Sequence, residues 1–260
     1  MVITLTTDFG YQDPFVGIMK GVIATINPQA QVIDISHGVP AQDIMAGALI
    51  LQQAVPYFPA GTIHVAVVDP GVGGGRKPIL IEQGGSYFIG PDNGVLSLAL
   101  AGKPSKRIVE LTNRDYQLKN LSNTFHGRDI FAPVAAHLAA GVLATQFGAP
   151  LETIVQLPMP EVVSGENQIT GEIIYIDGFG NLFTNLRQRD LTGQPSERLA
   201  VELAGRALDG LVTTYGAVGA GEFACLWNSW GLLEISVNGG NARKQTGAKI
   251  GDRVTLKVSQ

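Results

Sequence analysis

Two aspartates at the ends of expected strands are the first residues in this sequence that could carry chemistry. Asp8 and Asp69 each follow a short run that predicts a β-strand, Val2–Leu5 and Thr62–Val68. In open α/β sheets, ligands bind in the crevice outside the carboxyl ends of the parallel strands. The two carboxylates therefore mark a candidate site, although either could equally serve as a helix N-cap or a turn residue.

The loop that starts at Asp69 is unusually rich in glycine. It reads DPGVGGGR, with four glycines in residues 71–75, and it ends at Arg76. Glycine lets a backbone approach a ligand closely, but the loop fits neither the phosphate-binding GxxxxGK[ST] pattern nor GxGxxG. A flexible surface turn is the alternative interpretation. The carboxylate and the guanidinium at its two ends favour a functional loop.

A third candidate lies at His126. The run FHGRD, residues 125–129, brings an acid, a base and an imidazole together just before the helix expected over residues 130–142. A lone histidine is more often structural than catalytic, and we expect Asp129 to cap the helix. From the residues alone, both interpretations of His126 stay open.

Polar and aromatic residues also gather in loops of the C-terminal part. These loops are DGFGN (177–181), NSW (228–230) and NGGN (238–241). Taken alone, they predict β-turns. An aromatic ring flanked by asparagine amides would also suit a purine, through stacking and hydrogen bonds to the base edge.

The elements that must position these residues change in character along the chain. In the first part, strand-like runs alternate with amphipathic helices such as residues 15–26, which predicts an α/β fold with a mostly parallel sheet flanked by helices. Later, short strand-like runs are separated by Gly, Asn and Asp, which predicts a small antiparallel β-barrel. We therefore expect an α/β N-terminal domain over residues 1–160 and a C-terminal β-barrel domain over residues 168–260.

Composition narrows the classes of function. The 260 residues are 45% hydrophobic and 15% charged, which excludes a disordered chain. The formal net charge of −4 argues against a nucleic-acid partner, because phosphate contacts need a basic surface. The longest nearly apolar run, residues 131–144, is shorter than the roughly 20 residues that span a bilayer, so we expect no membrane partner.

Cysteine and histidine usage bears on metals and on location. Cys225 is the only cysteine, and His37, His64 and His137 lack the i, i+4 spacing of a zinc-binding helix, so we expect no metal site. A single cysteine and an N-terminus without signal-peptide features predict a cytoplasmic protein.

Together, the motifs resemble one enzyme family. The matching segments are TLTTDFG (4–10), VVDPGVGGGR (67–76), GPDNG (90–94), TFHGRDIFAPVAAHLAAG (124–141), IDGFGNLFTN (176–185) and NSWGLLEISVNGGNA (228–242). They are similar to motifs of the S-adenosyl-L-methionine (SAM) hydroxide adenosyltransferases, relatives of the SAM-dependent fluorinase and chlorinase. The resemblance spans nearly the whole chain. It implies the two domains described above, a homotrimer with sites at subunit interfaces, SAM as a small-molecule substrate, and no added cofactor.

The resemblance also implies a role for each candidate residue. Family members that use water resemble one another in a trio that falls on Asp69, Arg76 and His126. The fluorinase differs at Asp69, where it has a tyrosine, and at Gly127, where it has a halide-binding serine, which implies water or hydroxide as the nucleophile here. For the sugar and the base, the implied contacts are Asp8 to the ribose hydroxyls, and Phe179, Asn181 and the loop around Asn238 to adenine. For the methionine part, they are Asp13 and Asp177 to the amino group and Ser229 to the carboxylate. Trp230 is the implied contact at the position where the halogenase has an arginine.

The expected reaction is hydrolysis of SAM to adenosine and L-methionine by attack at ribose C5′. Methionine leaves as a neutral thioether, so the site needs a positioned oxygen nucleophile rather than a general acid. Arg76 can stabilise a developing hydroxide, while His126 or Asp69 accepts the proton or orients the water. Three alternatives stay open: a halogenase of the same fold, a non-catalytic SAM- or adenosine-binding protein, and a metal-dependent phosphohydrolase built on Asp8 and Asp69.

Overall fold

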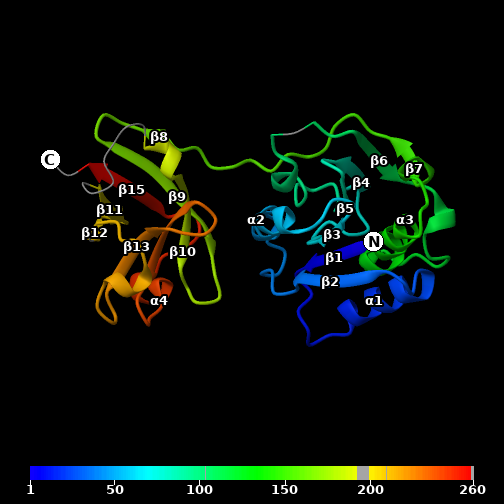
Figure 1. The fold of residues 1–260 in the computed structure, drawn as a ribbon, viewed down its shortest axis with the longest axis horizontal. Helices are drawn as coiled ribbons and strands as arrows, with labels where there is room; N and C mark the ends of the chain where they lie inside the picture. The colour runs from blue at the N-terminus through cyan, green and yellow to red at the C-terminus, as the bar shows by residue number, and fades with distance from the viewer. Residues whose placement is uncertain (103, 192–198, 209, 259–260) are drawn as a thin grey trace. The chain divides into compact units, whose positions relative to one another are not determined.

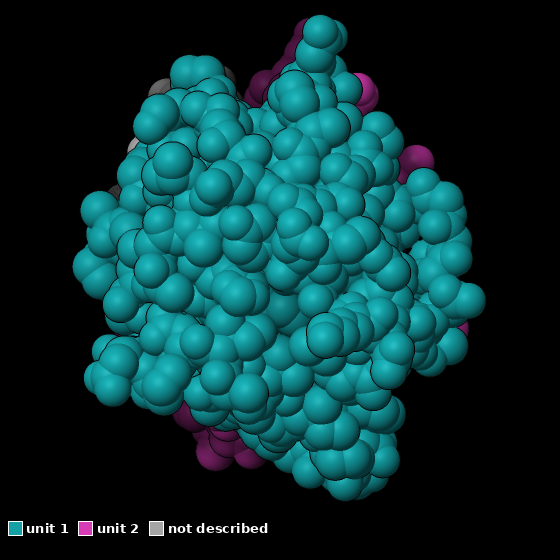
Figure 2. Space-filling model, turned by 90° about the vertical axis from the view of Figure 1, so that its right-hand side faces the viewer, with its two compact units in different colours: residues 1–157 teal, residues 158–260 magenta. Residues whose placement is uncertain are grey.

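Two compact units make up the chain in the computed structural model, residues 1–157 (unit 1) and 158–260 (unit 2) (Figure 1). The structure describes residues 1–102, 104–191, 199–208 and 210–258. The atoms of unit 1 form a continuous surface on the face shown in Figure 2. None of the described helices is long and apolar enough to cross a membrane.

Unit 1 is built on a mixed sheet whose described strands have the order β2-β1-β3-β5-β4-β6-β7. The first four strands in this order run parallel, and β4, β6 and β7 extend the sheet in antiparallel fashion. The strands are β1 (Val2–Thr7), β2 (Gln31–Ser36), β3 (Ile63–Val67), β4 (Pro78–Gln83), β5 (Ser86–Pro91), β6 (Arg107–Leu111) and β7 (Gly148–Pro150). Because β1 and β3 are direct neighbours, residues that follow their carboxyl ends meet at one edge of the sheet (Figure 1).

Among the described residues, three α-helices accompany this sheet: α1 (Phe15–Ile26), α2 (Ile44–Ala54) and α3 (Ala132–Ala139). Met19 and Ile23 of α1 and the buried residues of α3 share one hydrophobic cluster with β1 and β3, whereas the buried residues of α2 lie outside it. Asp43 caps α2, since its carboxylate accepts a hydrogen bond from the backbone N–H of Ala46 at 2.9 Å. The cap fixes the end of the loop that joins β2 to α2.

Unit 2 is an antiparallel, barrel-like sheet with the described strand order β12-β11-β15-β9-β10-β14-β13, and β8 pairs with β9 outside this path. Its elements are β8 (Val163–Ser164), β9 (Gln168–Ile176), β10 (Leu182–Arg187), β11 (Leu199–Leu203), β12 (Arg206–Leu208), β13 (Phe223–Trp227), β14 (Leu232–Val237), the short helix α4 (Ala242–Thr246) and β15 (Arg253–Val258). Alternate residues of these strands, such as Leu199, Val201 and Leu203, fill its core. The predicted fold class, a mixed α/β domain followed by an antiparallel barrel, is confirmed.

His64 gives unit 1 a stability that depends on pH. Its imidazole is fully buried in β3 between Phe58 and Phe88, with Nδ1 2.9 Å from the Thr4 hydroxyl. Burial lowers the pKa of His64 to about 4. Between pH 6.5 and that value the unfolded chain binds a proton that the folded chain does not, so stability falls as the pH drops.

At pH 5 this linkage corresponds to a loss of about 2 kcal/mol relative to pH 7.5. Urea unfolding at the two pH values measures it, and His64→Gln, which does not titrate, should remove about that much of the difference. An equal loss of stability in the wild type and the variant would contradict the assignment.

Candidate active site

Arg76 joins Asp69 and His126 into one hydrogen-bonded chain. Its Nε donates to the two carboxylate oxygens of Asp69 at 2.9 and 3.0 Å, and its Nη2 also contacts Asp69 Oδ2. The same Nη2 lies 2.8 Å from Nδ1 of His126. The side chains of Asp69 and Arg76 are only 5% and 9% exposed. The structure thus brings together the three residues that the family resemblance assigns to catalysis.

The glycine-rich loop holds Arg76 in place by packing against another part of the backbone. Gly73 has a positive φ of 74°, and a Cβ added there would lie 2.1 Å from the carbonyl oxygen of Asn123. Only glycine tolerates both this positive φ and the close approach of its α-carbon to the carbonyl oxygen of Asn123. Asn123 lies three residues before His126, so this contact sets the separation between the loop and the histidine. The loop is therefore packed against its neighbour rather than a loose surface turn.

His126 is positioned by the turn that follows it. Residues Gly127–Phe131 form a single π-helical turn that leads into α3. Asp129 is fully buried, and its carboxylate accepts hydrogen bonds from the backbone N–H of Ser122 at 2.7 Å and from Nε of Arg128 at 2.6 Å. The expectation that Asp129 caps the following helix is wrong. Its carboxylate instead ties down the segment that precedes His126.

The surroundings of His126 favour its neutral form. Burial and the positive charge of Arg76 lower its pKa, against the opposing effect of the Asp69 and Asp129 carboxylates. An arginine has donors but no acceptor, so its contact requires a lone pair on Nδ1 and leaves the imidazole proton on Nε2. In this tautomer Nε2 of His126 is a hydrogen-bond donor and cannot accept a proton.

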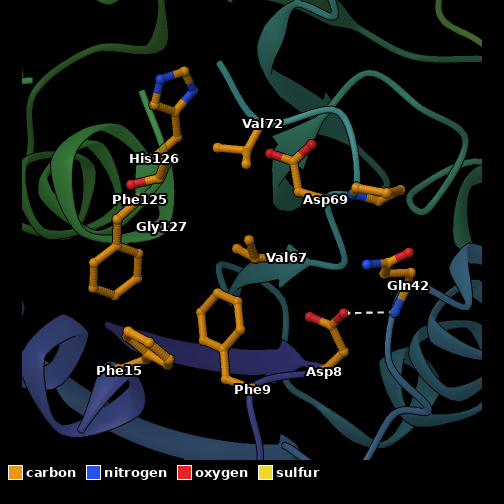
Figure 3. Close-up of a pocket in the computed structure, with 12 residues that line it drawn as sticks. Asp8, Phe9, Phe15, Gln42, Val67, Asp69, Val72, Phe125, His126 and Gly127 are labelled. Atoms are coloured by element: carbon orange, nitrogen blue, oxygen red, sulfur yellow. Dashed lines mark hydrogen bonds between the residues drawn. The ribbon is translucent and has the colours of Figure 1, made fainter. Parts of the chain in front are cut away.

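Asp69 and His126 line a cavity of about 350 Å³ in unit 1 (Figure 3). Phe9, Phe15 and Phe125 form one wall of it, with their rings in edge contact at centroid distances of 5.3–5.8 Å. The cavity thus places an apolar wall close to a carboxylate and an imidazole. Such walls exclude bulk water, which strengthens the electrostatic interactions inside.

Gly127 also lines this cavity, and its neighbours leave little room for a side chain. A Cβ added at Gly127 would lie 3.2 Å from Sδ of Met19 and from the ring of Phe125. Both neighbours would have to shift to accept a serine at this position.

Asp8 lies at the floor of the same cavity and is held by Gln42. The backbone N–H of Gln42 donates to Oδ2 of Asp8 at 2.8 Å (Figure 3). Gln42 itself has a φ of +65°, a left-handed conformation that costs a residue with a Cβ about 1–2 kcal/mol. Backbone strain of this kind is found most often at functional sites. No motif in the sequence marks Gln42, and sequence reasoning missed it.

A second cavity, of about 650 Å³, lies within unit 2. It gathers four of the expected substrate contacts, Asp177, Phe179, Asn181 and Ser229. Its lining also includes Phe183, Tyr215 and Glu234, which sequence reasoning missed. A signal for Glu234 existed: it is the one charged residue in the run LLEISV, whose other members read as a buried strand.

Asp13, Trp230 and Asn238 themselves are not among the residues that line either cavity, but Gly239 and Gly240, in the loop around Asn238, line the cavity in unit 2. Asp13 is exposed, just before α1. Trp230 lies beside the unit 2 cavity, where its ring stacks on Tyr175 and meets the edge of Phe183. The side-chain amide of Asn238 donates to the carbonyl of Val218 at 2.8 Å. In the described part of the chain, no group of three or more His, Cys, Asp or Glu side chains is arranged to hold a metal ion.

Known proteins resemble this chain, some of them over nearly its whole length. An (R)-S-adenosyl-L-methionine hydrolase from Salinispora tropica is 43% identical over 98% of this chain and 97% of its own. A fluorinase from Actinoplanes sp. is more distant, at 29% identity over 73% of each chain. The crystal structure of an uncharacterized conserved protein from Thermotoga maritima superposes with a TM-score of 0.91 at 36% identity, covering 99% of this chain and 100% of that one.

Family models match both units. The model of the SAM hydroxide adenosyltransferase N-terminal domain matches residues 3–148, and the model of the corresponding C-terminal domain matches residues 171–255. The chain therefore belongs to the SAM hydroxide adenosyltransferase family.

Proposed function

We propose that this protein hydrolyses SAM to adenosine and L-methionine by attack of water at ribose C5′. The observation that carries the proposal is the chain from Asp69 through Arg76 to His126, two of whose members line a cavity with an aromatic wall. The relative from Salinispora tropica, a SAM hydrolase with 43% identity over nearly the full length, supports SAM hydrolysis.

In the proposed mechanism, His126 holds the water and Asp69 takes its proton. The water accepts the Nε2–H of His126, and its oxygen attacks C5′ in line with the C5′–S bond. The electron pair of that bond passes to sulfur, which leaves as the thioether of methionine. The Asp69 carboxylate keeps spare lone pairs beside those that accept from Arg76, so it can receive the proton. Arg76, which does not line the cavity, holds Asp69 and His126 in place, and its positive charge acts on the developing negative charge from behind them.

The halogenase alternative fits this cavity less well. A halide ion would lie next to the poorly solvated carboxylate of Asp69, and like charges repel strongly where water is excluded. Gly127 has no hydroxyl that could bind a halide. Any side chain placed at this position would contact Met19 and Phe125 closely. Water, which is neutral and both donates and accepts hydrogen bonds, suits the same surroundings.

The binding-protein and phosphohydrolase alternatives differ from the proposal in what they release. The proposed reaction uses no metal and no added cofactor, because a neutral thioether leaves without Lewis-acid help. Turnover should therefore survive dialysis against a chelator, whereas a metal-dependent phosphohydrolase would lose it. A non-catalytic SAM-binding protein would release no adenosine.

Incubation of the protein with SAM in H₂¹⁸O tests the reaction directly. Adenosine should form together with L-methionine, and mass spectrometry should find one ¹⁸O in the adenosine, at its 5′ carbon. Formation of 5′-chloro-5′-deoxyadenosine in chloride buffer, or the absence of any adenosine, would overturn the proposal.

The proposal extends to the assembly and its location. The family resemblance suggests a homotrimer with sites at subunit interfaces, and the candidate residues are found in both units. Light scattering of the purified protein tests the trimer. The buried thiol of Cys225, the only cysteine, supports a location in the reducing cytoplasm.

A further inference from the structure

His37 is a buried histidine that the proposed mechanism does not use. It directly follows β2, the neighbour of β1 in the sheet, and only 1% of its surface is exposed. Its Nδ1 lies 2.7 Å from the hydroxyl of Thr7, the last residue of β1. Its backbone carbonyl accepts a hydrogen bond from the N–H of Gly10 at 2.8 Å. These two bonds enclose Asp8 and Phe9, both of which line the unit 1 cavity (Figure 3).

The hydroxyl of Thr7 connects the imidazole to the turn that carries Asp8. It also accepts a hydrogen bond from the backbone N–H of Phe9 at 3.2 Å, so it bridges the histidine and the residue that follows Asp8. The side chain of Thr7 is fully buried, and a buried hydroxyl or amide that loses its partner is costly. A shift of this turn would therefore break buried hydrogen bonds.

Asp34 approaches the opposite side of the imidazole. Its Oδ1 lies 3.1 Å from Nε2 of His37, and no other hydrogen bond of either atom is found among the described residues. Its Oδ2 accepts hydrogen bonds from Lys20 at 2.6 Å and from Tyr11 at 3.2 Å. Burial alone would raise the pKa of Asp34, but hydrogen bonding by Lys20 and His37 lowers it below the ordinary value, so the carboxylate is ionised at neutral pH.

The carboxylate of Asp34 determines which nitrogen of His37 carries a proton. It has no hydrogen to donate, so Nε2 must bear one, and Nδ1 of the neutral imidazole then accepts the hydrogen of the Thr7 hydroxyl. The oxygen of Thr7 keeps its lone pairs for the N–H of Phe9. Asp34, His37 and Thr7 thus form an ordered chain that ends on the turn carrying Asp8.

We propose that His37 is a positioning residue that holds Asp8 in place for the ribose hydroxyls of the substrate. This inference rests on the proposed function and on the ribose contact expected of Asp8. The amide of Gln42 restrains one carboxylate oxygen of Asp8 directly, whereas His37 fixes the backbone on both sides of it. Hydrogen bonds to a pair of hydroxyls need such a fixed backbone, because they weaken steeply as distance and angle depart from the ideal.

The test compares SAM with its 2′,3′-dideoxy analogue, which lacks both ribose hydroxyls. The wild type should prefer SAM by about 10- to 100-fold in KM, the usual effect of hydrogen bonds to a charged group. Thr7→Val keeps the shape of the side chain but removes the hydroxyl, so it should lose most of this preference. Its kcat for SAM should stay within about threefold of the wild type, because the ribose hydroxyls do not react. Thr7→Ser, which retains the hydroxyl, should retain the preference.

Two substitutions of His37 separate the roles of its two nitrogens. The amide of His37→Asn takes the place of Nδ1 and can still pair with the Thr7 hydroxyl, so the preference for SAM should be retained. The amide of His37→Gln reaches the place of Nε2 and keeps only the contact with Asp34, so most of the preference should be lost. A His37→Gln or Thr7→Val enzyme with the full preference would overturn the inference.

Thr4→Val is the matched control for Thr7→Val. The hydroxyl of Thr4, earlier in β1, lies 2.9 Å from Nδ1 of His64, and both side chains are fully buried. The control therefore also removes a buried hydrogen bond between a threonine and a histidine, but inside the strand rather than at the turn that carries Asp8. It should leave the preference for SAM unchanged. A merely structural role of Thr7 and His37 would weaken binding of both ligands alike, as in the control, and would contradict the positioning role.

Calorimetric binding of the two ligands keeps this test separate from the proposed reaction. If the wild type binds SAM with a preference that depends on Thr7 and His37 but forms no adenosine, the proposed function fails and the positioning role stands. If adenosine forms but the preference is absent, or is independent of these two residues, the positioning role fails and the function stands. A wild type that binds neither ligand overturns both.

Discussion

Replacing Arg76 with lysine should lower kcat for SAM hydrolysis by about 10²-fold, because the groups that Arg76 holds in place would shift, and displacements of about 1 Å have effects of this size on catalysis. The guanidinium contacts Asp69 through Nε and Nη2 and reaches His126 from the same Nη2. A lysine ammonium carries the charge but lacks the planar fork that makes these contacts simultaneously. Its loss also frees Nδ1 of His126, so the imidazole no longer has one defined tautomer.

The measurement for Arg76→Lys is steady-state formation of adenosine, with KM recorded beside kcat. KM should change little, because Arg76 is buried behind Asp69 and is not among the residues that line the cavity. Arg114→Lys, at an exposed arginine that bonds only to Gln117 among the described residues, serves as the matched control and should retain normal kcat. Near-normal turnover of Arg76→Lys would remove the guanidinium from the mechanism.

The second large effect is expected from one methyl group in the glycine-rich loop. Gly73→Ala places a Cβ 2.1 Å from the carbonyl oxygen of Asn123 and forces alanine into a positive φ. The left-handed conformation and the overpacking together should cost about 2–4 kcal/mol of unfolding free energy. The loop must move away from Asn123 to relieve the contact, and Arg76 then separates from His126. Turnover should fall by roughly 100-fold, since displacements of about 1 Å have such effects on catalysis.

The same loop provides its own control, two residues further on. A Cβ added at Gly75 meets no atom within 4 Å, and the φ of Gly75 is not positive. Gly75→Ala should therefore stay within a few-fold of wild-type turnover and within about 0.5 kcal/mol of its stability. Thermal unfolding and adenosine formation measure both quantities. Equal behaviour of the two variants would show that the contact with Asn123 does not position Arg76.

Local patterns were sufficient to predict the fold class. Hydrophobic periodicity and turn residues are encoded over a few neighbouring positions, so the helix over residues 15–26 and the hairpin of β4 and β5 can be read directly. The order of the strands depends on contacts between distant segments. For this reason no local sequence pattern predicts that β6 and β7 extend the sheet in antiparallel fashion. One of the short strand-like runs of the C-terminal part, residues 211–214, shows how local patterns mislead: among its described residues only Leu211 pairs, in an isolated bridge to Cys225.

The candidate site was predictable in part for the same reason. Asp8 and Asp69 follow neighbouring parallel strands, and a general rule for α/β sheets places ligands there. The contact between Arg76 and His126 spans 50 residues and was expected only from the family resemblance. Gln42 takes part through its backbone, which no residue type reveals. Glu234 is buried by strands whose pairing the sequence does not state.

The left-handed backbone at Gln42 limits how this position can change in evolution. Asparagine, aspartate and glycine adopt that conformation readily, while valine, isoleucine and threonine are genuine outliers there. A relative with a β-branched residue at the equivalent position must have rebuilt the segment, and the aspartate that corresponds to Asp8 would lose the amide that restrains it. One column of an alignment thus distinguishes relatives that keep this restraint from those that have abandoned it.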